Sequence, residues 1–244
     1  MGARGAALVT GAARRIGRAL ALAAAEAGYD VAVHHRDSAD DAEATAAAVR
    51  DKGVRAEVIA ADLNDNPQQL IEQASAALGP VTLLVNNASV FLDDTLQTLT
   101  REHWDAHMEA NLHAPVALTQ AFAAQGAEGL VVNIVDQRVW RPNPQFFSYS
   151  LSKAGLWWAT RTMAQALAPR IRVNAIGPGP TLPSIHQDAA DFDAEARNVP
   201  LERRATPDEI AAALRYLIDA PSVTGQMIAV DGGQHLGWKT PDIA

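Results

Sequence analysis

Residues 6–17 read AALVTGAARRIG, and this stretch decides the fold of the chain. Its first four residues, Ala6 to Val9, predict a short buried strand, and the residues from Ile16 onward predict a helix. Between them, Gly11 permits a tight turn and a close approach of the backbone to a ligand. The start of a helix presents free N–H groups to an anion such as a pyrophosphate. Gly11 and Gly17 alone would be a weak signal, but their place between a strand and a helix predicts a dinucleotide-binding turn.

The same alternation of short apolar runs and alanine-rich helical segments continues along the chain. We expect strands at residues 6–9, 31–34, 55–60, 83–85, 130–135, 171–176 and 227–230. We expect helices at residues 16–27, 38–52, 67–78, 101–125, 149–167 and 207–219, the fourth of which could bend near Pro115. Such repetition predicts an α/β fold, a doubly wound parallel sheet with helices on both faces. We expect a single domain over residues 1–244, with a substrate flap, or else a plain surface loop, at about 177–204.

Composition and charge exclude several classes of protein. The 244-residue chain has a net charge of −8, whereas a nucleic-acid surface needs basic patches. It has no Cys, so it has no disulfide framework, thiolate nucleophile or Cys-ligated metal. No apolar run approaches the roughly 18 residues of a membrane helix, and no signal-peptide core is present. We therefore expect a cytoplasmic protein, and, since the His residues lack ligand spacing, no metal site.

The second strand ends at His34-His35-Arg36-Asp37-Ser38, where cofactor choice is decided in this kind of fold. An acid at this place usually binds the ribose 2′-OH of NAD, whereas an Arg suits the 2′-phosphate of NADP. Arg36, supported by Ser38 and Arg14, favours NADP, although Asp37 is a counter-signal. His34 and His35 can be half-buried loop residues without chemistry, and His35 is a cofactor-binding candidate by its position alone. Further candidates stand at the next strand ends, namely Asp62, Leu63, Asn87, Ala88 and Ser89.

Tyr149 and Lys153 stand four residues apart in Tyr-Ser-Leu-Ser-Lys, with Asp136 upstream. Residues i and i+4 share one helix face, so the ammonium and the phenol would lie close together. A nearby ammonium favours the phenolate and lowers the pKa of a Tyr from about 10. Such a Tyr can give a proton to a substrate. The pattern alone could also be a surface helix that happens to carry one Tyr and one Lys.

These motifs in this order resemble the short-chain dehydrogenase/reductase family. The matched signals are Thr10-Gly11…Gly17, Asp62, Asn86-Asn87-Ala88, Asn111, Tyr149…Lys153, Pro178-Gly179 and Val230-Asp231-Gly232-Gly233. The resemblance implies a Rossmann-type fold, a nicotinamide cofactor and hydride transfer. It implies that Tyr149 donates the proton, that Lys153 holds the nicotinamide ribose, and that Asn111 supports a water-linked proton relay at a helix kink. It places the cofactor against Gly11, Ile16, Gly17, Asn87, Tyr149, Lys153, Pro178, Gly179 and Thr181, the last near the carboxamide.

Two departures from the common family pattern narrow the resemblance to one branch. Asp136 replaces the usual catalytic Ser, and Arg15 replaces the middle glycine of the phosphate loop. Both are similar to the pteridine reductases and the short-chain dihydromonapterin or dihydrofolate reductases. This branch also carries Asn-Asn-Ala-Ser followed by an aromatic residue, here Phe91. It implies that Phe91 stacks on the pterin, that Arg15 reaches the pterin and a cofactor phosphate, and that Ser89, Asp136 and Tyr149 complete the substrate site.

The chemistry agrees with a pterin, because a carboxylate accepts N–H bonds better than a hydroxyl does. Our main hypothesis is an NADPH-dependent reductase of dihydromonapterin, dihydrobiopterin or dihydrofolate. The alternatives are a reductase of a carbonyl, such as a 3-oxoacyl thioester or a sugar ketone, and a non-catalytic NADP-sensing protein. Asp136 could be a degenerate position, Phe91 a core aromatic and Arg15 only a phosphate clamp.

Assembly is also implied by the family, whose members commonly pair the helices that carry Asn111 and Tyr149. We expect a homotetramer, with a dimer as second choice. Trp157 and Trp158 are adjacent on one helix, so one should pack inward while the other faces a neighbour. The segment at residues 234–238 is apolar enough to be buried, either as a docked terminus or over a neighbouring subunit's pocket.

Overall fold

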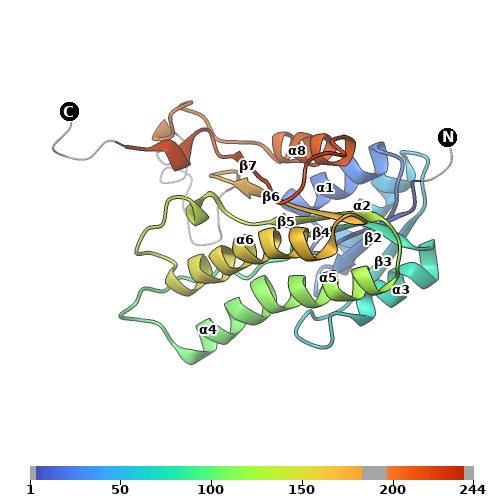
Figure 1. Ribbon diagram of the computed structural model, residues 1–244, viewed down its shortest axis with the longest axis horizontal. Coiled ribbons are helices and arrows are strands. Elements are labelled where there is room, and N and C mark those ends of the chain that lie inside the picture. The colour runs from blue at the N-terminus through green and yellow to red at the C-terminus, as the bar shows by residue number, and fades with distance from the viewer. Residues whose placement is uncertain (1–3, 183–196, 239–244) are drawn as a thin grey trace.

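The computed structural model describes residues 4–182 and 197–238, and these residues form a seven-stranded parallel sheet between two layers of helices (Figure 1). The sheet order is β3-β2-β1-β4-β5-β6-β7. Every pair of neighbours is parallel. The strands are β1 (Ala6–Val9), β2 (Asp30–His35), β3 (Ala56–Ala60), β4 (Val81–Asn86), β5 (Gly129–Ile134), β6 (Ile171–Pro178) and β7 (Met227–Val230). The predicted doubly wound α/β fold is confirmed. The order in which successive strands are added to the sheet reverses between β1 and β4, and sheets of this kind bind ligands at such a switch point.

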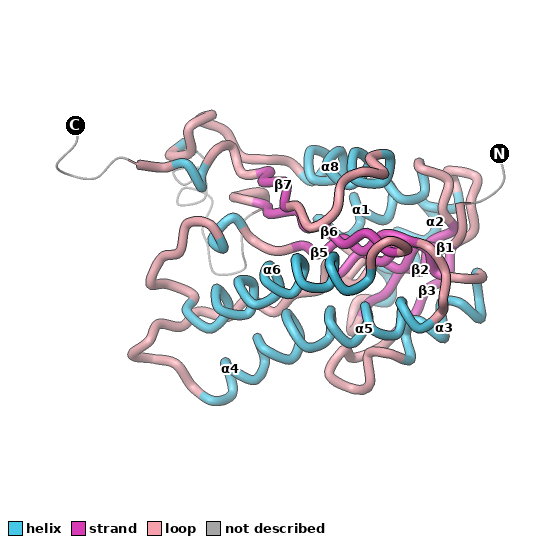
Figure 2. Tube along the Cα trace, viewed as in Figure 1, coloured by secondary structure: helices cyan, strands magenta, loops and turns pink. Residues whose placement is uncertain are grey.

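The helices divide between the two faces of the sheet (Figure 2). One face is covered by α1 (Arg15–Glu26), α2 (Ala39–Arg50) and α8 (Pro207–Asp219). The other is covered by α3 (Gln69–Leu78), α5 (Ala114–Ala124) and α6 (Phe147–Leu167), with α4 (Arg101–Met108) beside α6. Short 3-10 turns follow β5 and β7, at η2 (Gln137–Val139) and η3 (Gln234–Leu236).

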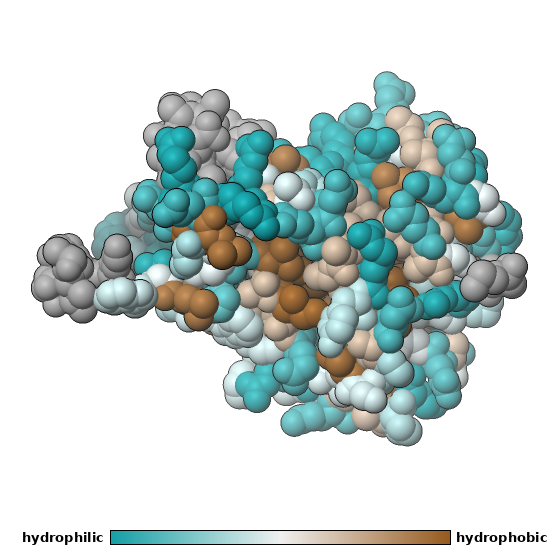
Figure 3. All heavy atoms as spheres, turned by 90° about the horizontal axis from the view of Figure 1, so that it is seen from above, coloured by the Kyte–Doolittle hydropathy of each residue, from teal (hydrophilic) through white to brown (hydrophobic). Residues whose placement is uncertain are grey.

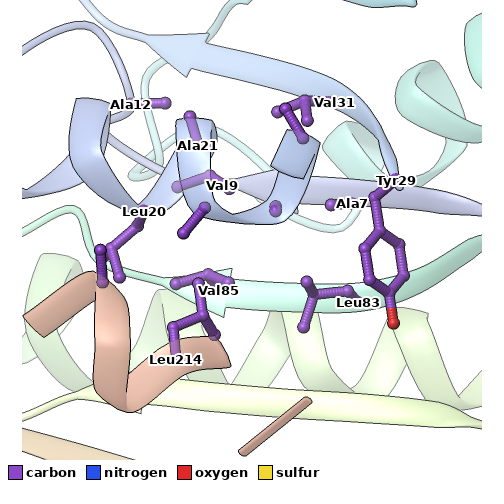
Figure 4. Packing of buried hydrophobic residues seen from close by; sticks show 14 of the residues in the cluster. Ala7, Val9, Ala12, Leu20, Ala21, Tyr29, Val31, Leu83, Val85 and Leu214 are labelled. Atoms are coloured by element: carbon purple, nitrogen blue, oxygen red, sulfur yellow. The ribbon is translucent and has the colours of Figure 1, made fainter. Parts of the chain in front are cut away.

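The strands are apolar along their whole length because both of their faces are covered. All four residues of β1 are fully buried, and their side chains alternate between the two helical layers. Val9 packs with Val85 toward Leu20 and Leu214 on the side of α1 and α8 (Figure 4). Leu8 joins the opposite cluster with residues of α3 and α5. The two cores hold the carboxyl ends of β1 and β4 in fixed positions, and these ends carry the site.

The predicted helix at 101–125 is interrupted in the structure. Between α4 and α5 the chain makes a π-helical turn, η1 (Glu109–His113), which contains Asn111. Pro115 is one of the first residues of α5. The irregularity is therefore the π turn before Pro115, and inserted π turns occur frequently at functional sites.

The first two residues of the predicted flap belong to the sheet. Gly177 and Pro178 are the last residues of β6 and pair with Ala229 and Val230 of β7. The middle of the predicted flap, residues 183–196, lies outside the described residues.

On the side of α1 and α8, apolar residues stand among hydrophilic ones (Figure 3). Within the described ranges, no helix combines the length and apolarity needed to cross a membrane.

Candidate functional site

The turn between β1 and α1 is shaped by its glycines. Gly11 has φ +61, a left-handed conformation that suits glycine. A Cβ on Gly17 would collide with the Gly11 carbonyl oxygen and would lie 2.7 Å from Asn87 Nδ2. Arg15 stands where the common pattern has a glycine, and it keeps the left-handed backbone at φ +55. At the N-cap of α1 the Arg14 side chain makes no capping bond, and the N-terminal end of a helix attracts an anion.

Thr10 and Asn87 join the ends of β1 and β4 beside this turn. Thr10 Oγ1 accepts hydrogen bonds from the backbone N–H groups of Asn87 at 2.9 Å and Ala88 at 3.0 Å. Asn87 Nδ2 donates to the carbonyl oxygens of Thr10 at 2.8 Å and Gly11 at 3.1 Å. These bonds hold the two strand ends together at the switch point of the sheet.

His34 has a role here that the sequence did not indicate. Its Nδ1 accepts the Gly11 N–H at 3.0 Å, so its Nε2 is the atom that donates to the Ala61 carbonyl at 3.1 Å. Burial lowers the pKa of His34 to about 4. The neutral imidazole therefore ties the glycine turn to the end of β3. Its only sequence signal was its place at the end of β2.

A cleft of about 440 Å³ opens over these strand ends. Thirteen of the residues predicted to bind the cofactor line it, namely Gly11, Arg14, Arg15, Ile16, Gly17, His35, Arg36, Ser38, Asp62, Leu63, Asn87, Ala88 and Ser89. His35 is buried, and its Nδ1 has no hydrogen-bond partner among the described residues. A helix N-terminus without a side-chain cap, a glycine without room for a Cβ, and a buried nitrogen without a partner among the described residues together fit a dinucleotide.

Two cationic side chains lie at the α2 end of this cleft. Arg36 Nε lies 2.6 Å from Asp37 Oδ2, and Arg14 Nε lies 3.6 Å from Asp41 Oδ2. Exposed ion pairs of this kind contribute little stability, so a phosphate can replace the carboxylates. Ser38 is the N-cap of α2, and its side chain makes no capping bond. Two guanidinium groups and a hydroxyl therefore line this end of the cleft, from Arg36, Arg14 and Ser38, and their contact with a 2′-phosphate stays a prediction.

The predicted proton donor and its acid meet at the end of β5. Tyr149 Oη donates to Asp136 Oδ2 at 3.0 Å, and Asp136 Oδ1 accepts the backbone N–H of Arg138 at 2.8 Å. Lys153 is buried on the same helix, where its Nζ donates to the Ile134 carbonyl at 2.9 Å and lies 5.8 Å from the centre of the Tyr149 ring. The three groups predicted to act together are therefore neighbours in the structure.

The sequence predicted a lowered pKa for Tyr149, and this prediction is wrong. Burial raises the pKa of Tyr149 well above its ordinary value, and the Asp136 carboxylate raises it further. Burial also raises the pKa of Asp136, an effect that the Arg138 charge opposes. Burial lowers the pKa of Lys153 to about 8. A nearby ammonium alone would lower this pKa, whereas the phenol is also bonded to a carboxylate and shielded from water.

Asn111 joins the loop after β4 to α6. Its Oδ1 accepts hydrogen bonds from Ser89 Oγ at 3.1 Å and the Val90 N–H at 2.8 Å. Its Nδ2 donates to the Val90 carbonyl at 2.9 Å and to Ser152 Oγ at 3.1 Å. The π turn directs this buried amide toward both segments. Its part in a proton relay stays a prediction.

Phe91 lies against Tyr149, although one of its faces is covered. Its ring centre is 4.7 Å from that of Tyr149 in an edge contact and 4.3 Å from that of Phe146 in a stacked one. Phe146 has φ +53 at the N-cap of α6, and no sequence pattern pointed to its role. Arg15 Nη2 reaches the Leu182 carbonyl at 3.3 Å, beyond β6.

Three hydrogen-bonded polar side chains anchor the loop that carries Phe91, and no sequence pattern indicated them. His107 Nε2 accepts the Leu92 N–H at 3.0 Å, so its Nδ1–H donates to Ser148 Oγ at 2.7 Å. Ser148 Oγ in turn donates to the Asp94 carboxylate, which also accepts the Ser148 N–H at 3.1 Å. All three side chains are buried. They fix the loop to the N-terminal end of α6, one residue before Tyr149.

Pro178, Gly179 and Thr181 lie at the end of β6, and they do not line the cleft. The Gly179 N–H donates to the Val230 carbonyl at 3.1 Å, and a Cβ on Gly179 would lie 2.7 Å from Asp231. Thr181 is buried and donates to the Gly179 carbonyl at 3.0 Å. Their contact with a cofactor stays a prediction. Over residues 4–182 and 197–238, no three His, Asp or Glu side chains converge as metal ligands would.

Known proteins similar to this chain include several reductases and structures solved with NADP or NADPH. A family model described as enoyl-(acyl carrier protein) reductase, of the short-chain type, matches residues 11–235. The chain is similar to the crystal structure of the FolM alternative dihydrofolate reductase 1 from Brucella suis in complex with NADP, at 51% identity and a TM-score of 0.96 over 100% of both chains. It is 34% identical to the 3-oxoacyl-[acyl-carrier-protein] reductase FabG of Staphylococcus epidermidis, over 94% of this chain and 98% of that protein. A blue fluorescent protein from a metagenomic library, solved with NADPH, is 32% identical with a TM-score of 0.89, over 95% of this chain and 98% of that one. The chain therefore belongs to the short-chain dehydrogenase/reductase family.

Proposed function

We propose that this chain is a cytoplasmic NADPH-dependent reductase of a reduced pterin of the dihydromonapterin, dihydrobiopterin or dihydrofolate type. The observation that carries the proposal is the 3.0 Å bond between Tyr149 Oη and Asp136 Oδ2, beside the ring of Phe91. A carboxylate at this place can accept the several N–H groups of a pterin, which a Ser hydroxyl would do less well. The likeness to FolM at 51% identity supports the same substrate class.

NADP is the cofactor that the cleft supports. The α1 N-terminus and Gly17 would face the pyrophosphate, and Arg36, Arg14 and Ser38 would face the 2′-phosphate. The solved FolM and blue fluorescent protein structures contain NADP and NADPH, respectively. When bound, NADPH supplies the hydride.

The residues around Tyr149 would supply the proton. Reduction of a C=N bond places a hydride on carbon and a proton on the adjacent nitrogen. Because the pKa of Tyr149 is raised, its phenol stays protonated at neutral pH and keeps a proton to give. Substrate N–H groups that bind Asp136 would compete for the carboxylate that Tyr149 now contacts. This competition would turn the phenol O–H toward the substrate.

The test mixes the protein with NADPH and 7,8-dihydromonapterin, 7,8-dihydrobiopterin or dihydrofolate, and follows the loss of nicotinamide absorbance. We expect turnover in the wild type and a loss of about 10²- to 10⁴-fold in Tyr149→Phe, which keeps the ring and removes the proton. NADPH binding without turnover of any pterin would reject the proposal and leave a carbonyl substrate or a sensor.

A second candidate function is reduction of a 3-oxoacyl thioester, which the likeness to FabG favours. Asp136→Ser separates the two, because it restores the common family residue. A pterin reductase should lose its pterin turnover in this variant. Full pterin activity in Asp136→Ser would show that the carboxylate has no part in recognising the substrate.

We include a homotetramer in the proposal. Trp157 packs inward, while Trp158 is 65% exposed, and Leu151 and Val116 are exposed on α6 and α5. Leu236 and Trp238 were expected to be buried, yet both are largely exposed in the single chain. A neighbouring subunit would cover such side chains. Light scattering on the purified protein, with Trp158→Glu as the variant, tests the assembly.

A further inference from the structure

Arg138 lies inside the proposed substrate site without an assigned role. It follows Asp136 by two residues in the η2 turn, and its side chain is only 15% exposed. Its Nη1 lies 3.7 Å from Asp136 Oδ2, the same oxygen that Tyr149 contacts. The carboxylate is therefore placed between a phenol and a guanidinium.

The guanidinium also covers the aromatic wall of the site. The guanidinium carbon, Arg138 Cζ, lies 5.0 Å from the centre of the Phe146 ring and 5.9 Å from that of Phe91. A planar cation stacks favourably on aromatic faces, which a Lys ammonium does less well. Arg138 thus touches both groups that would meet a flat substrate, the carboxylate and the stacked rings.

One donor of this side chain is unused. Arg138 Nε is buried and has no hydrogen-bond partner among the described residues. A buried N–H without an acceptor is costly, so unpaired buried donors are rare outside functional sites. Asp136 can accept N–H groups but can donate none while ionised, so a pterin held by it would leave its own ring acceptors unmatched.

We propose that Arg138 is a specificity-determining residue, whose Nε–H donates to an acceptor atom of a flat heteroaromatic substrate held beside Phe91 and Asp136. The inference rests on the proposed function, since it assumes a ligand with N–H donors and ring acceptors on adjacent edges. Arg138 and Asp136 together form a donor–acceptor pair that matches such an edge. A simple ketone offers only the acceptor.

Arg138→Met and Arg138→Lys test the proposal with a dihydropterin as substrate. Arg138→Met keeps the length and apolar bulk but removes the donor, so KM should rise about ten- to a hundredfold, more than kcat falls. Arg138→Lys keeps the charge beside Asp136, Tyr149 and Lys153 but lacks the Nε–H, so its pH profile should stay near that of the wild type while KM stays high. NADPH affinity should be unchanged in both variants. Arg141→Met is the matched control, because Arg141 is exposed in the following loop, where it donates to the Gln234 carbonyl at 3.0 Å.

The outcomes separate this inference from the proposed function. A wild type that neither reduces nor binds a dihydropterin overturns both. A wild type that turns over, with KM within about twofold in Arg138→Met, overturns only the role of Arg138. Full recovery of KM in Arg138→Lys would also overturn it, because charge alone would then suffice. A parallel loss of NADPH affinity would make Arg138 a residue of the fold and reject its role in specificity.

Discussion

The cofactor half and the substrate half of this molecule are built by different means. Around the β1–α1 turn, the surface offered to a ligand is mainly backbone: Gly11 supplies a left-handed turn, Gly17 leaves no room for a side chain, and a helix end supplies N–H groups. The side chains of His34 and Asn87 brace this turn from behind. Around Tyr149, the geometry is made by buried polar side chains, of which Asp94, His107 and Ser148 are examples. A site made of backbone recognises a group that many ligands share, such as a phosphate. A site made of side chains can change its substrate through substitution of those side chains. The fold can therefore keep its cofactor while its substrate varies.

The largest effect should come from filling the cofactor turn. Gly17→Ala places a methyl group against the Gly11 carbonyl, a backbone atom that cannot move without moving the turn. We expect NADPH affinity to fall at least about a hundredfold, with about 1–3 kcal/mol less stability, measured by fluorescence titration and urea unfolding.

Gly53→Ala is the matched control for this change. Gly53 has φ +84, but a Cβ added to it would meet nothing within 4 Å, so it isolates backbone strain from lack of space. It should cost about 1 kcal/mol of stability and leave NADPH affinity unchanged. Equal NADPH affinity in Gly17→Ala and Gly53→Ala would contradict the view that the cofactor half depends on close backbone approach.

A smaller effect is expected from His34, the side chain that holds the cofactor turn through the Gly11 N–H. Its pKa is about 4 in the folded protein, against about 6.5 when unfolded, so the unfolded state binds more protons between these values. Its contribution to stability is therefore complete above pH 6.5 and is lost as the pH falls through 4. Between pH 7.5 and pH 4.5, the wild type should lose about 2 to 3 kcal/mol more stability than His34→Asn.

Urea unfolding of both proteins at the two pH values measures this difference, and the subtraction removes groups that titrate in common, such as Asp136. Parallel pH dependence in the two proteins would mean that His34 is charged, or free of the Gly11 N–H, in solution. The cofactor turn would then be held without the His34 side chain, and the comparison between the halves would become sharper.

The two halves also differ in how well the sequence predicted them. Gly11 and Gly17 were predictable because a turn between a strand and a helix has few solutions, and Tyr149 with Lys153 because spacing sets a helix face. Asn87 was predictable from its place after a strand end and from the family resemblance. His107 and Phe146 were not predictable, since their partners are distant in sequence; Asp94 and Ser148 are separated by 54 residues. The Tyr149 pKa was predicted in the wrong direction because burial, its largest cause, belongs to the folded chain and not to the motif.

The smallest effect should come from Ser148→Ala, which removes the middle member of the buried His107–Ser148–Asp94 series of hydrogen bonds in the substrate half. The change removes the donor to the Asp94 carboxylate and the acceptor of His107 Nδ1–H, while Asp94 keeps the Ser148 backbone N–H. We expect about 2 kcal/mol less stability, because a hydrogen bond to a buried charged group is lost. The Phe91 loop should also loosen, so kcat/KM for a dihydropterin should fall while NADPH affinity stays the same.

Ser150→Ala is the control, since Ser150 lies two residues further along α6 and its hydroxyl has no partner among the described residues. If Ser148→Ala weakened NADPH binding as much as substrate turnover, the two halves would be one mechanical unit, and substrate specificity could not change independently of the cofactor site.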